Sequence, residues 1–184
     1  MNRIAIPSAT QTPAASIPLL DAVNKQLGVV PNLMRLIGNS PAALEGYLSL
    51  NAALQKGSIG AKTAERIALA IAETNACSYC LSAHRYLGEN VAKLDAAEMD
   101  ANRNGASSDP KANAAIRFAN SVALARGHVA DADIQAVKAA GFNNAEVIEI
   151  VLHVALNTLT NYVNEVAQTE IDFPEVHPHL RKAA

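Results

Sequence analysis

The sequence is poor in aromatic residues, which make up 4% of its 184 residues, and it contains no tryptophan. A core must therefore be built mainly from aliphatic side chains, and hydrophobic residues are plentiful at 50%. Alanine, leucine, isoleucine and valine suit the close packing of helices against one another. The length is that of a single globular unit, so we expect one helical domain.

An excess of charge of either sign is also lacking, because the formal net charge is −2 at pH 7 and the pI is near 6.2. Such a chain has no electrostatic footprint for nucleic acid or an anionic membrane. No apolar run is long enough to cross a bilayer, and residues 1–18 lack the apolar stretch of a signal peptide. We therefore expect no nucleic-acid or membrane partner and a cytoplasmic location.

Cysteine occurs only twice, and the two residues form a C-x-x-C motif at Cys77 and Cys80. His84 follows four residues later, and two acids, Glu65 and Glu73, precede the pair. In a reducing compartment such a pair is more often catalytic or metal-binding than a structural disulfide. The motif is therefore the first candidate for a functional site.

The residues around the motif predict an αα-hairpin. Ala-rich residues 61–74 are typical of a helix, and Asn75 is a suitable N-cap for a second one. The cysteines then lie in the first turns of the second helix, open to solvent, where the helix dipole favours a thiolate. A hairpin brings Glu65 level with His84. In an unbroken helix Glu73 would instead share one stripe with the cysteines and His84; we favour the hairpin.

Within the hairpin, Glu65, His84 and Cys80 form a candidate proton relay. His84 lies one helical turn after Cys80, so it can take the thiol proton and then stabilise the thiolate. Helix position alone would make Cys77 the more exposed and more acidic thiol, whereas His84 favours Cys80 as the nucleophile.

Two other interpretations of the thiol pair stay open. The cysteines could be an inert pair in the core, which would need neither the histidine nor the acid. They could also bind zinc together with His84 and a distant fourth ligand such as His153, although structural zinc sites more often contain two such pairs. We favour a redox dithiol with no bound cofactor and no metal ion.

Glu65, eleven intervening residues and Cys77-x-x-Cys80-x-x-x-His84 resemble the signature of the carboxymuconolactone decarboxylase superfamily. The two cysteines resemble its alkyl hydroperoxidase D-like branch, and the resemblance extends from about residue 31 to residue 174. It implies an all-α, AhpD-like helical bundle with the C-x-x-C at the N-terminus of a helix in an αα-hairpin. Tyr79 stands where the prototype has a second histidine.

The resemblance implies a thiol-dependent peroxidase, or disulfide oxidoreductase, in which the Cys80 thiolate attacks a hydroperoxide and Cys77 then closes a disulfide. The implied reductant is a dihydrolipoyl group, carried by a dithiol protein. Two other functions stay open: the lactone decarboxylase that names the superfamily, and a non-enzymatic redox-sensing or zinc-binding protein. The apolar chain and the resemblance together predict a homo-oligomer, a trimer or a hexamer.

The rest of the chain divides into an N-terminal arm at residues 1–15, a single helical domain at 16–175 and a C-terminal tail at 176–184. Other predicted helices span residues 17–27, 31–37, 41–56, 110–126, 131–140 and 144–168, with a further short helix starting near residue 95. Residues 144–168 are apolar on nearly all sides, which predicts a central helix. In the helix at residues 41–56, Tyr47 fits core packing better than a substrate contact.

Four candidate supporting residues complete the site: Tyr79, Glu73, His153 and Asn157. The last two belong to a polar stripe on the final helix, which also contains Asn161 and Asn164. This stripe could line the thiol pocket, but we favour a polar network at a subunit interface.

Overall fold

The computed structural model describes residues 2–179. These residues form α-helices and one short 3-10 helix, and no strand occurs among them, which confirms the all-α prediction. The elements are, in chain order, η1 (Ala14–Ser16), α1 (Ile17–Leu27), α2 (Asn32–Ile37), α3 (Pro41–Leu54), α4 (Gly60–Thr74), α5 (Ser78–Asn90), α6 (Ala96–Arg103), α7 (Pro110–Leu124), α8 (Asp131–Ala139) and α9 (Asn144–Ala167).

Several helices begin at residues with capping side chains, at or next to the predicted starts. Ser40 caps α3 and Asp95 caps α6, each accepting a hydrogen bond from an N–H of the first turn. Asn143 and Glu146 form a reciprocal capping box at the start of α9. Local sequence signals therefore set where these elements begin.

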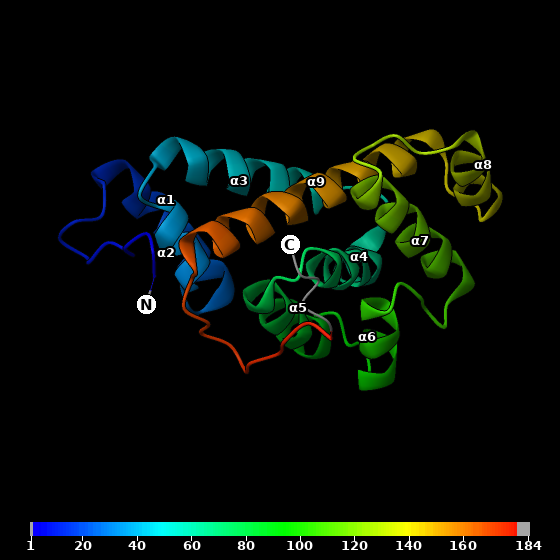
Figure 1. The fold of residues 1–184 in the computed structure, drawn as a ribbon. Coiled ribbons are helices and arrows are strands. Elements are labelled where there is room, and N and C mark those ends of the chain that lie inside the picture. The colour runs from blue at the N-terminus through cyan, green and yellow to red at the C-terminus, as the bar shows by residue number, and fades with distance from the viewer. Residues whose placement is uncertain (1, 180–184) are drawn as a thin grey trace.

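Helix α4 is the central helix of the bundle, and it packs against α5, α6, α7 and α9. Residues 67–72 of α4 are all buried. Helix α9 crosses one side of the molecule beside α3, and α5 and α6 lie on the other side of α4 (Figure 1). The prediction that α9 is central is confirmed in part, because α9 packs against α3, α4, α5, α7 and α8, but its outer face leaves large apolar side chains exposed. These include Ile148, Leu159, Tyr162 and Val166.

Two main clusters of buried side chains lie on either side of α4. One packs α4 against α7, α8 and α9, and it contains Ile67, Phe118, Val137 and Ile150. The other packs α1, α2 and α3 against the α4–α5 hairpin, and it contains both cysteines. The thiol pair is therefore part of the hydrophobic core.

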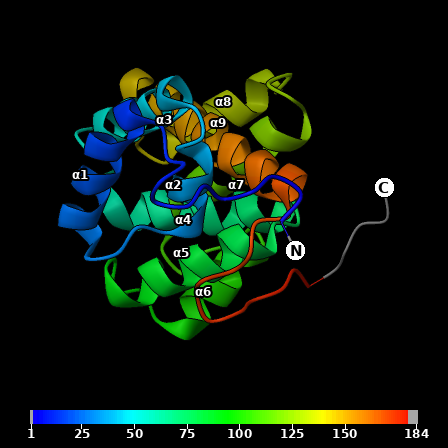
Figure 2. The ribbon, with the colours of Figure 1, turned by 90° about the vertical axis from the view of Figure 1, so that its left-hand side faces the viewer.

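The C-terminal segment, residues 170–179, returns from the end of α9 and passes along α5 and α6 (Figure 2). Ile171, Phe173 and Val176 pack against the cluster that contains the cysteines. The ring of Phe173 also meets the ring of Tyr79 edge-on, with centroids 5.9 Å apart. Residues 180–184 of the predicted tail lie outside the described residues.

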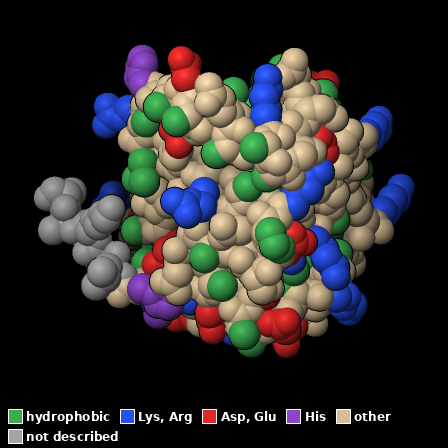
Figure 3. Space-filling view, turned by 90° about the vertical axis from the view of Figure 1, so that its right-hand side faces the viewer, with side chains coloured by type: hydrophobic (Ala, Val, Ile, Leu, Met, Phe, Trp, Pro, Cys, Tyr) green, Lys and Arg blue, Asp and Glu red, His purple; other side chains and the backbone are tan. Residues whose placement is uncertain are grey.

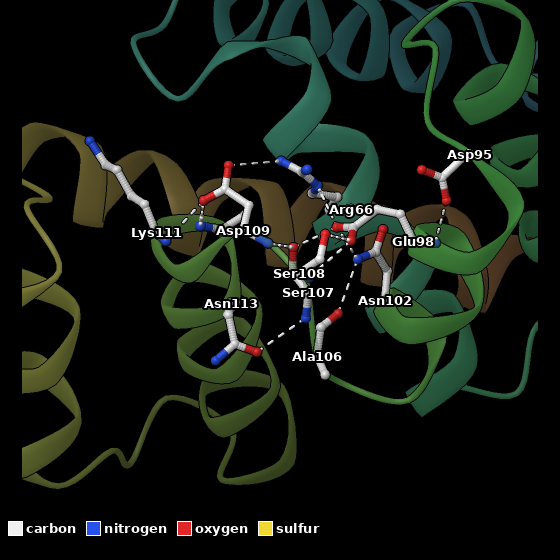
Figure 4. A network of polar contacts seen from close by, with 11 residues as sticks. Arg66, Asp95, Glu98, Asn102, Ala106, Ser107, Ser108, Asp109, Lys111 and Asn113 are labelled. Carbon is white, nitrogen blue, oxygen red and sulfur yellow. Dashed lines mark hydrogen bonds and ion pairs between the residues drawn. The ribbon is translucent and has the colours of Figure 1, made fainter.

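A buried carboxylate ties α4 to α6 and to the loop before α7. Glu98 accepts hydrogen bonds from Arg66, Asn102, Ser107 and Ser108, which converge on its two oxygens (Figure 4). Burial alone would raise the pKa of Glu98, but the hydrogen bonds from the two serines and Asn102 outweigh it and lower the pKa to about 2. The carboxylate therefore stays charged and holds these three segments together.

The end of the molecule near α8 shows acidic and basic side chains interspersed with apolar ones (Figure 3).

Among residues 2–179, no single helix has the length and apolarity needed to cross a bilayer, and the bent pair α8 and α9 meets these criteria only when both helices are taken together.

Candidate functional site

The chain turns between Thr74 and Ser78, which confirms the predicted hairpin of α4 and α5. The predicted cap was wrong, because Asn75 ends α4 and Cys77 is the N-cap of α5. The Asn75 side chain instead donates a hydrogen bond to Asn161 on α9, at 2.8 Å. Ala76 makes the turn in the left-handed region, with φ of 54°. Cys77 thus lies at the start of α5, and its sulfur accepts the backbone N–H of Cys80.

The hairpin places Glu65 beside His84, as the sequence predicts. Glu65 Oε2 and His84 Nδ1 are 2.9 Å apart, and each side chain is 21% exposed. Because Nδ1 faces the carboxylate, Nε2 is the ring nitrogen left for a thiol or a substrate. The charge of Glu65 and its hydrogen bond outweigh burial and raise the pKa of His84.

Both sulfur atoms are buried, which contradicts the expectation of an open pair. Cys77 is 0% and Cys80 is 2% exposed, so Cys77 is not the more exposed thiol. The reason is tertiary, since helices α1, α2 and α3 and the C-terminal segment pack against the cluster that contains both cysteines. The burial fits a core pair, yet the hydrogen-bonded pair of His84 and Glu65 one turn along α5 does not.

The two thiols have opposite acidities. Their sulfur atoms are 2.7 Å apart, with Cys77 as donor and Cys80 as acceptor. This hydrogen bond, together with burial, raises the pKa of Cys77. Burial also opposes a thiolate at Cys80, but the Cys77 hydrogen bond, the charge of His84 and the amides of Asn164 and Asn161 lower its pKa. Cys80 is therefore the more acidic thiol, contrary to the expectation from helix position.

The polar stripe of α9 faces the interior of the chain. Asn164 Nδ2 donates to Cys80 Sγ at 3.2 Å, across 84 residues of sequence. His153, Asn157, Asn161 and Asn164 are all at least nine-tenths buried. The favoured interpretation as a subunit-interface network was therefore wrong, and the alternative, that the stripe lines the thiol site, holds for its C-terminal half.

The other two members of the stripe contribute less directly. Asn157 donates to the backbone carbonyl of His153 on its own helix. Burial lowers the pKa of His153, and the nearby charges of Glu149 and Glu65 oppose this shift. His153 thus lies on the Glu65 side of the site, and its Nε2 has no hydrogen-bond partner within residues 2–179.

Tyr79 and Glu73 do not join the thiols. The Tyr79 hydroxyl accepts the backbone N–H of Leu33 and donates to Asp172. Glu73 pairs with Arg103 at 2.8 Å. Both residues therefore hold other segments against the hairpin: Tyr79 holds the start of α2 and the C-terminal segment, and Glu73 accepts the backbone N–H of residue 179.

Tyr47, for which the sequence predicts core packing, lies at the site. Tyr47 on α3 is partly buried against the cysteine cluster. Burial, and then the negative charges of Cys80 and Glu65, raise its pKa to about 12. Its hydroxyl therefore stays protonated next to the relay. No signal in the sequence separates this tyrosine from a core residue, because helical spacing is the same for both.

The residues proposed for zinc are not arranged as a metal centre. Within residues 2–179, no group of three or more His, Cys, Asp or Glu side chains is placed to hold a metal ion. The imidazole of His84 is turned to Glu65 instead. The chemistry available to the site is that of two thiols in contact, one of them activated.

Comparisons with known proteins concern the family profile and the fold. Residues 41–121 match the sequence profile of the carboxymuconolactone decarboxylase family. No curated protein matches the sequence. Among solved structures, a peroxidase-related protein with an alkylhydroperoxidase AhpD core from Ralstonia eutropha JMP134 has a TM-score of 0.82 at 24% identity, covering 93% of this chain and 92% of that one.

Two further structures share the fold. A peroxidase-related protein from Silicibacter sp. TM1040 has a TM-score of 0.78 at 20% identity, with 91% of this chain and 89% of that chain covered. A cysteine-to-alanine variant of the debrominase Bmp8, in complex with 2,3,4-tribromopyrrole, has a TM-score of 0.76 at 18% identity, with 92% and 91% covered. The fold is thus common to peroxidase-related proteins and to a debrominase.

Proposed function

We propose that this protein is a thiol-dependent peroxidase, because residues 41–121, which contain both cysteines, Glu65 and His84, match the carboxymuconolactone decarboxylase family, and residues 2–179 have the AhpD-like fold. It reduces hydroperoxides with the Cys77–Cys80 dithiol. The observation that carries the proposal is the contact of two thiol sulfurs 2.7 Å apart, one turn before a histidine that is hydrogen-bonded to a carboxylate at 2.9 Å. The lowered pKa of Cys80 and the raised pKa of Cys77 agree with it.

The first step is attack by the Cys80 thiolate on the terminal oxygen of a hydroperoxide. A sulfur–oxygen bond forms, the oxygen–oxygen bond breaks, and the leaving alkoxide takes a proton from the His84 imidazolium. The sulfur is oxidised to a sulfenic acid, and the peroxide is reduced to an alcohol. Glu65 holds the ring of His84 and stabilises its positive charge.

The second step is the attack of Cys77 on the sulfenic acid. A disulfide forms, and the hydroxyl group leaves as water with the proton of the Cys77 thiol. Because the two sulfurs already touch, this step needs little movement of the backbone. An external dithiol such as a dihydrolipoyl group then restores both thiols by exchange and becomes the disulfide itself.

Substrate has to reach sulfurs that are buried. His84 and Glu65 are the partly exposed members of the relay, and Tyr47 on α3 is partly exposed as well. We place the entry between α3 and the hairpin, at these three side chains. Exchange with a dithiol needs a wider opening than a small peroxide does, which makes movement over the hairpin part of the proposed cycle.

The test follows peroxide consumption with reduced lipoamide as the electron donor. Wild type should turn over, and Cys80→Ser should abolish turnover. Cys77→Ser should react once, form a sulfenic acid and stop. His84→Gln should slow the reaction strongly, whereas His128→Gln, at an exposed histidine in a turn, should not.

Two outcomes would remove the proposal: full turnover by Cys80→Ser, or thiols in the wild type that peroxide leaves untouched. A lactone decarboxylase would give the second outcome, and a redox sensor would oxidise once without turnover. A brominated pyrrole serves as the contrasting substrate, since reductive debromination would also convert the dithiol to a disulfide while releasing bromide.

A further inference from the structure

We infer that Asn161 and Asn164 form a two-amide donor site around the reacting sulfur: Asn164 binds the Cys80 sulfur, and Asn161 binds the oxygen that the sulfur takes from a hydroperoxide. This inference rests on the proposed function. It assigns catalytic contacts to two residues of α9 that lie far from the motif in the sequence.

The role of Asn164 follows from its contact with the sulfur. Its Nδ2 donates to Cys80 Sγ at 3.2 Å, and the side chain is almost fully buried. Its Oδ1 has no hydrogen-bond partner within residues 2–179. The sulfur is thus the anchor that fixes the orientation of the amide. An amide donor aimed at a sulfur in a buried site favours the anionic form of that sulfur.

The role of Asn161 follows from the different surroundings of its two amide atoms. Its Oδ1 accepts a hydrogen bond from Asn75 at 2.8 Å, so its Nδ2 is turned the other way. That Nδ2 is buried and has no partner within residues 2–179. Asn161 lies one helical turn before Asn164 on the same face of α9, and Asn164 contacts Cys80 Sγ at 3.2 Å, so the free N–H lies on the side of the sulfur. The same amide contributes to the lowered pKa of the Cys80 thiol. An unpaired, buried N–H beside the reacting atom is destabilising unless a ligand satisfies it.

The ligand that fits this free donor is the transferred oxygen of a hydroperoxide. The oxygen bound to sulfur in the sulfenic acid has lone pairs that can accept the Asn161 N–H. A donor already in place stabilises the charge that develops on the oxygen as the oxygen–oxygen bond breaks. Asn75, in the hairpin turn, donates to Asn161 Oδ1 and so holds the Asn161 amide in this orientation. Asn75 does not cap α5; it is a positioning residue.

The experiment compares two reactions of Cys80 in a Cys77→Ser background. Iodoacetamide alkylates the thiolate without delivering a hydroperoxide oxygen, whereas hydrogen peroxide delivers one. Asn164→Leu should slow both reactions by about tenfold at neutral pH, because the thiol pKa rises by roughly one unit. Their ratio should stay constant, and the pH profile of alkylation should shift upward.

Asn161→Leu should act differently. Oxidation by peroxide should fall by at least about tenfold more than alkylation does, because removal of a donor to a developing oxyanion costs this much or more. Asn161→Asp keeps the acceptor for Asn75 but lacks the N–H donor. It should reduce the ratio of oxidation to alkylation as well, which guards against a leucine variant that does not fold.

Thr160→Val is the matched control, since Thr160 is buried on the same helix and its hydroxyl bonds only to carbonyls of that helix. It should change neither rate. If wild type turns over peroxide but both Asn161 variants keep the wild-type ratio, the inference fails and the proposed function stands. If wild-type thiols do not react with peroxide, the function and the oxygen-binding role of Asn161 fail together, while the alkylation profile still tests the Asn164 contact.

Discussion

At the scale of single residues, the two sulfur atoms differ because different groups surround them. Cys77 is a hydrogen-bond donor to its neighbour, which keeps its own proton in place. Cys80 accepts hydrogen bonds from Cys77 and from the Asn164 amide, and the charge of His84 also lowers its pKa. A thiolate next to an imidazolium is the form in which such a cysteine is a good nucleophile.

Glu65→Gln should make Cys80 less acidic. Burial lowers the pKa of His84, and the charge of Glu65 is the largest effect that opposes it, so loss of this charge should lower the pKa. The imidazolium is then lost at lower pH, and the pKa of Cys80 rises. The pH profile of alkylation in a Cys77→Ser background should shift upward, by about one pH unit.

The linkage of His84 to stability has a definite sign. A raised pKa contributes stability that is fully present below the unfolded pKa and is lost as pH rises through the folded pKa. Glu65→Gln should therefore weaken folding most on the acidic side of neutrality. Glu45→Gln, at an exposed position of α3, is the control. If the pH profile of alkylation is the same in Glu65→Gln and wild type, Glu65 is not part of the relay.

At the scale of elements, the hairpin turn stores local strain at Ala76. Its φ of 54° lies in the region that glycine adopts freely and alanine does not. Ala76→Gly should raise the free energy of unfolding by about 0.5–1 kcal/mol, since the strain exceeds the extra entropy of the unfolded glycine chain. Urea unfolding measures the difference.

Ala136→Gly is the control for the turn. This alanine is exposed in the middle of α8, where glycine should instead lower stability by about 1 kcal/mol. Opposite signs at the two positions are expected. A loss of stability at both would mean that the turn does not need the left-handed conformation.

The C-terminal segment is a second element with a distinct role, because it covers the cysteine cluster. Arg103 holds it by pairing with Glu73 and by donating to the carbonyl of His177 at 2.7 Å. Arg103→Gln should weaken the attachment of the C-terminal segment and so give reagents access to the sulfurs. We expect alkylation of the native protein to become several-fold faster at unchanged pH optimum, because the opened state becomes more populated.

Arg117→Gln, at an exposed arginine on α7, is the control for this change. Limited proteolysis after residue 174 should rise in parallel with alkylation in Arg103→Gln. Equal alkylation rates in wild type and Arg103→Gln would mean that the C-terminal segment does not limit access and that reagents use only the entry at Tyr47 and His84.

At the scale of the whole molecule, the apolar outer face of α9 is the surface best suited to meet a second copy of the chain. Leu159, Tyr162 and Val166 lie on it at helical spacing and are exposed. The predicted homo-oligomer, a trimer or a hexamer, should use this face. Leu159→Lys should lower the mass measured by analytical ultracentrifugation, whereas Lys138→Ala on α8 should not. A monomeric wild type would contradict the prediction.

The Glu98 network joins three segments, so it affects the stability of the whole fold. The folded pKa of about 2 lies below the ordinary value of 4.5. A lowered pKa contributes stability that is present above 4.5 and is lost as pH falls through the folded value. The shift corresponds to at most about 3 kcal/mol at neutral pH.

Glu98→Gln should therefore lower the free energy of unfolding at neutral pH by an amount of that order, about 2–3 kcal/mol. The difference from wild type should shrink as the pH falls below 4.5, because wild type then loses the same contribution. Urea unfolding at several pH values measures both curves. Glu89→Gln, at an exposed position, is the control, and a constant difference at all pH values would contradict the expected linkage.

The sequence by itself determined the hairpin, the first-turn position of the cysteines and the pairing of Glu65 with His84. These features depend on helix periodicity and on one break, and both are local properties of about 25 neighbouring residues. Capping residues such as Ser40, Asp95 and Asn143 fixed helix starts for the same reason. The relay could therefore be predicted before any packing was known.

Only the tertiary structure decided the burial of the sulfurs, the use of the α9 asparagines and the diversion of Tyr79 and Glu73 to the C-terminal segment. Asn164 meets Cys80 across 84 residues of sequence, and no periodicity within one helix encodes such a contact. Asn75 looked like a cap, but it found its partner on α9. Local patterns specify which face of a helix is polar, whereas packing between helices specifies what that face touches.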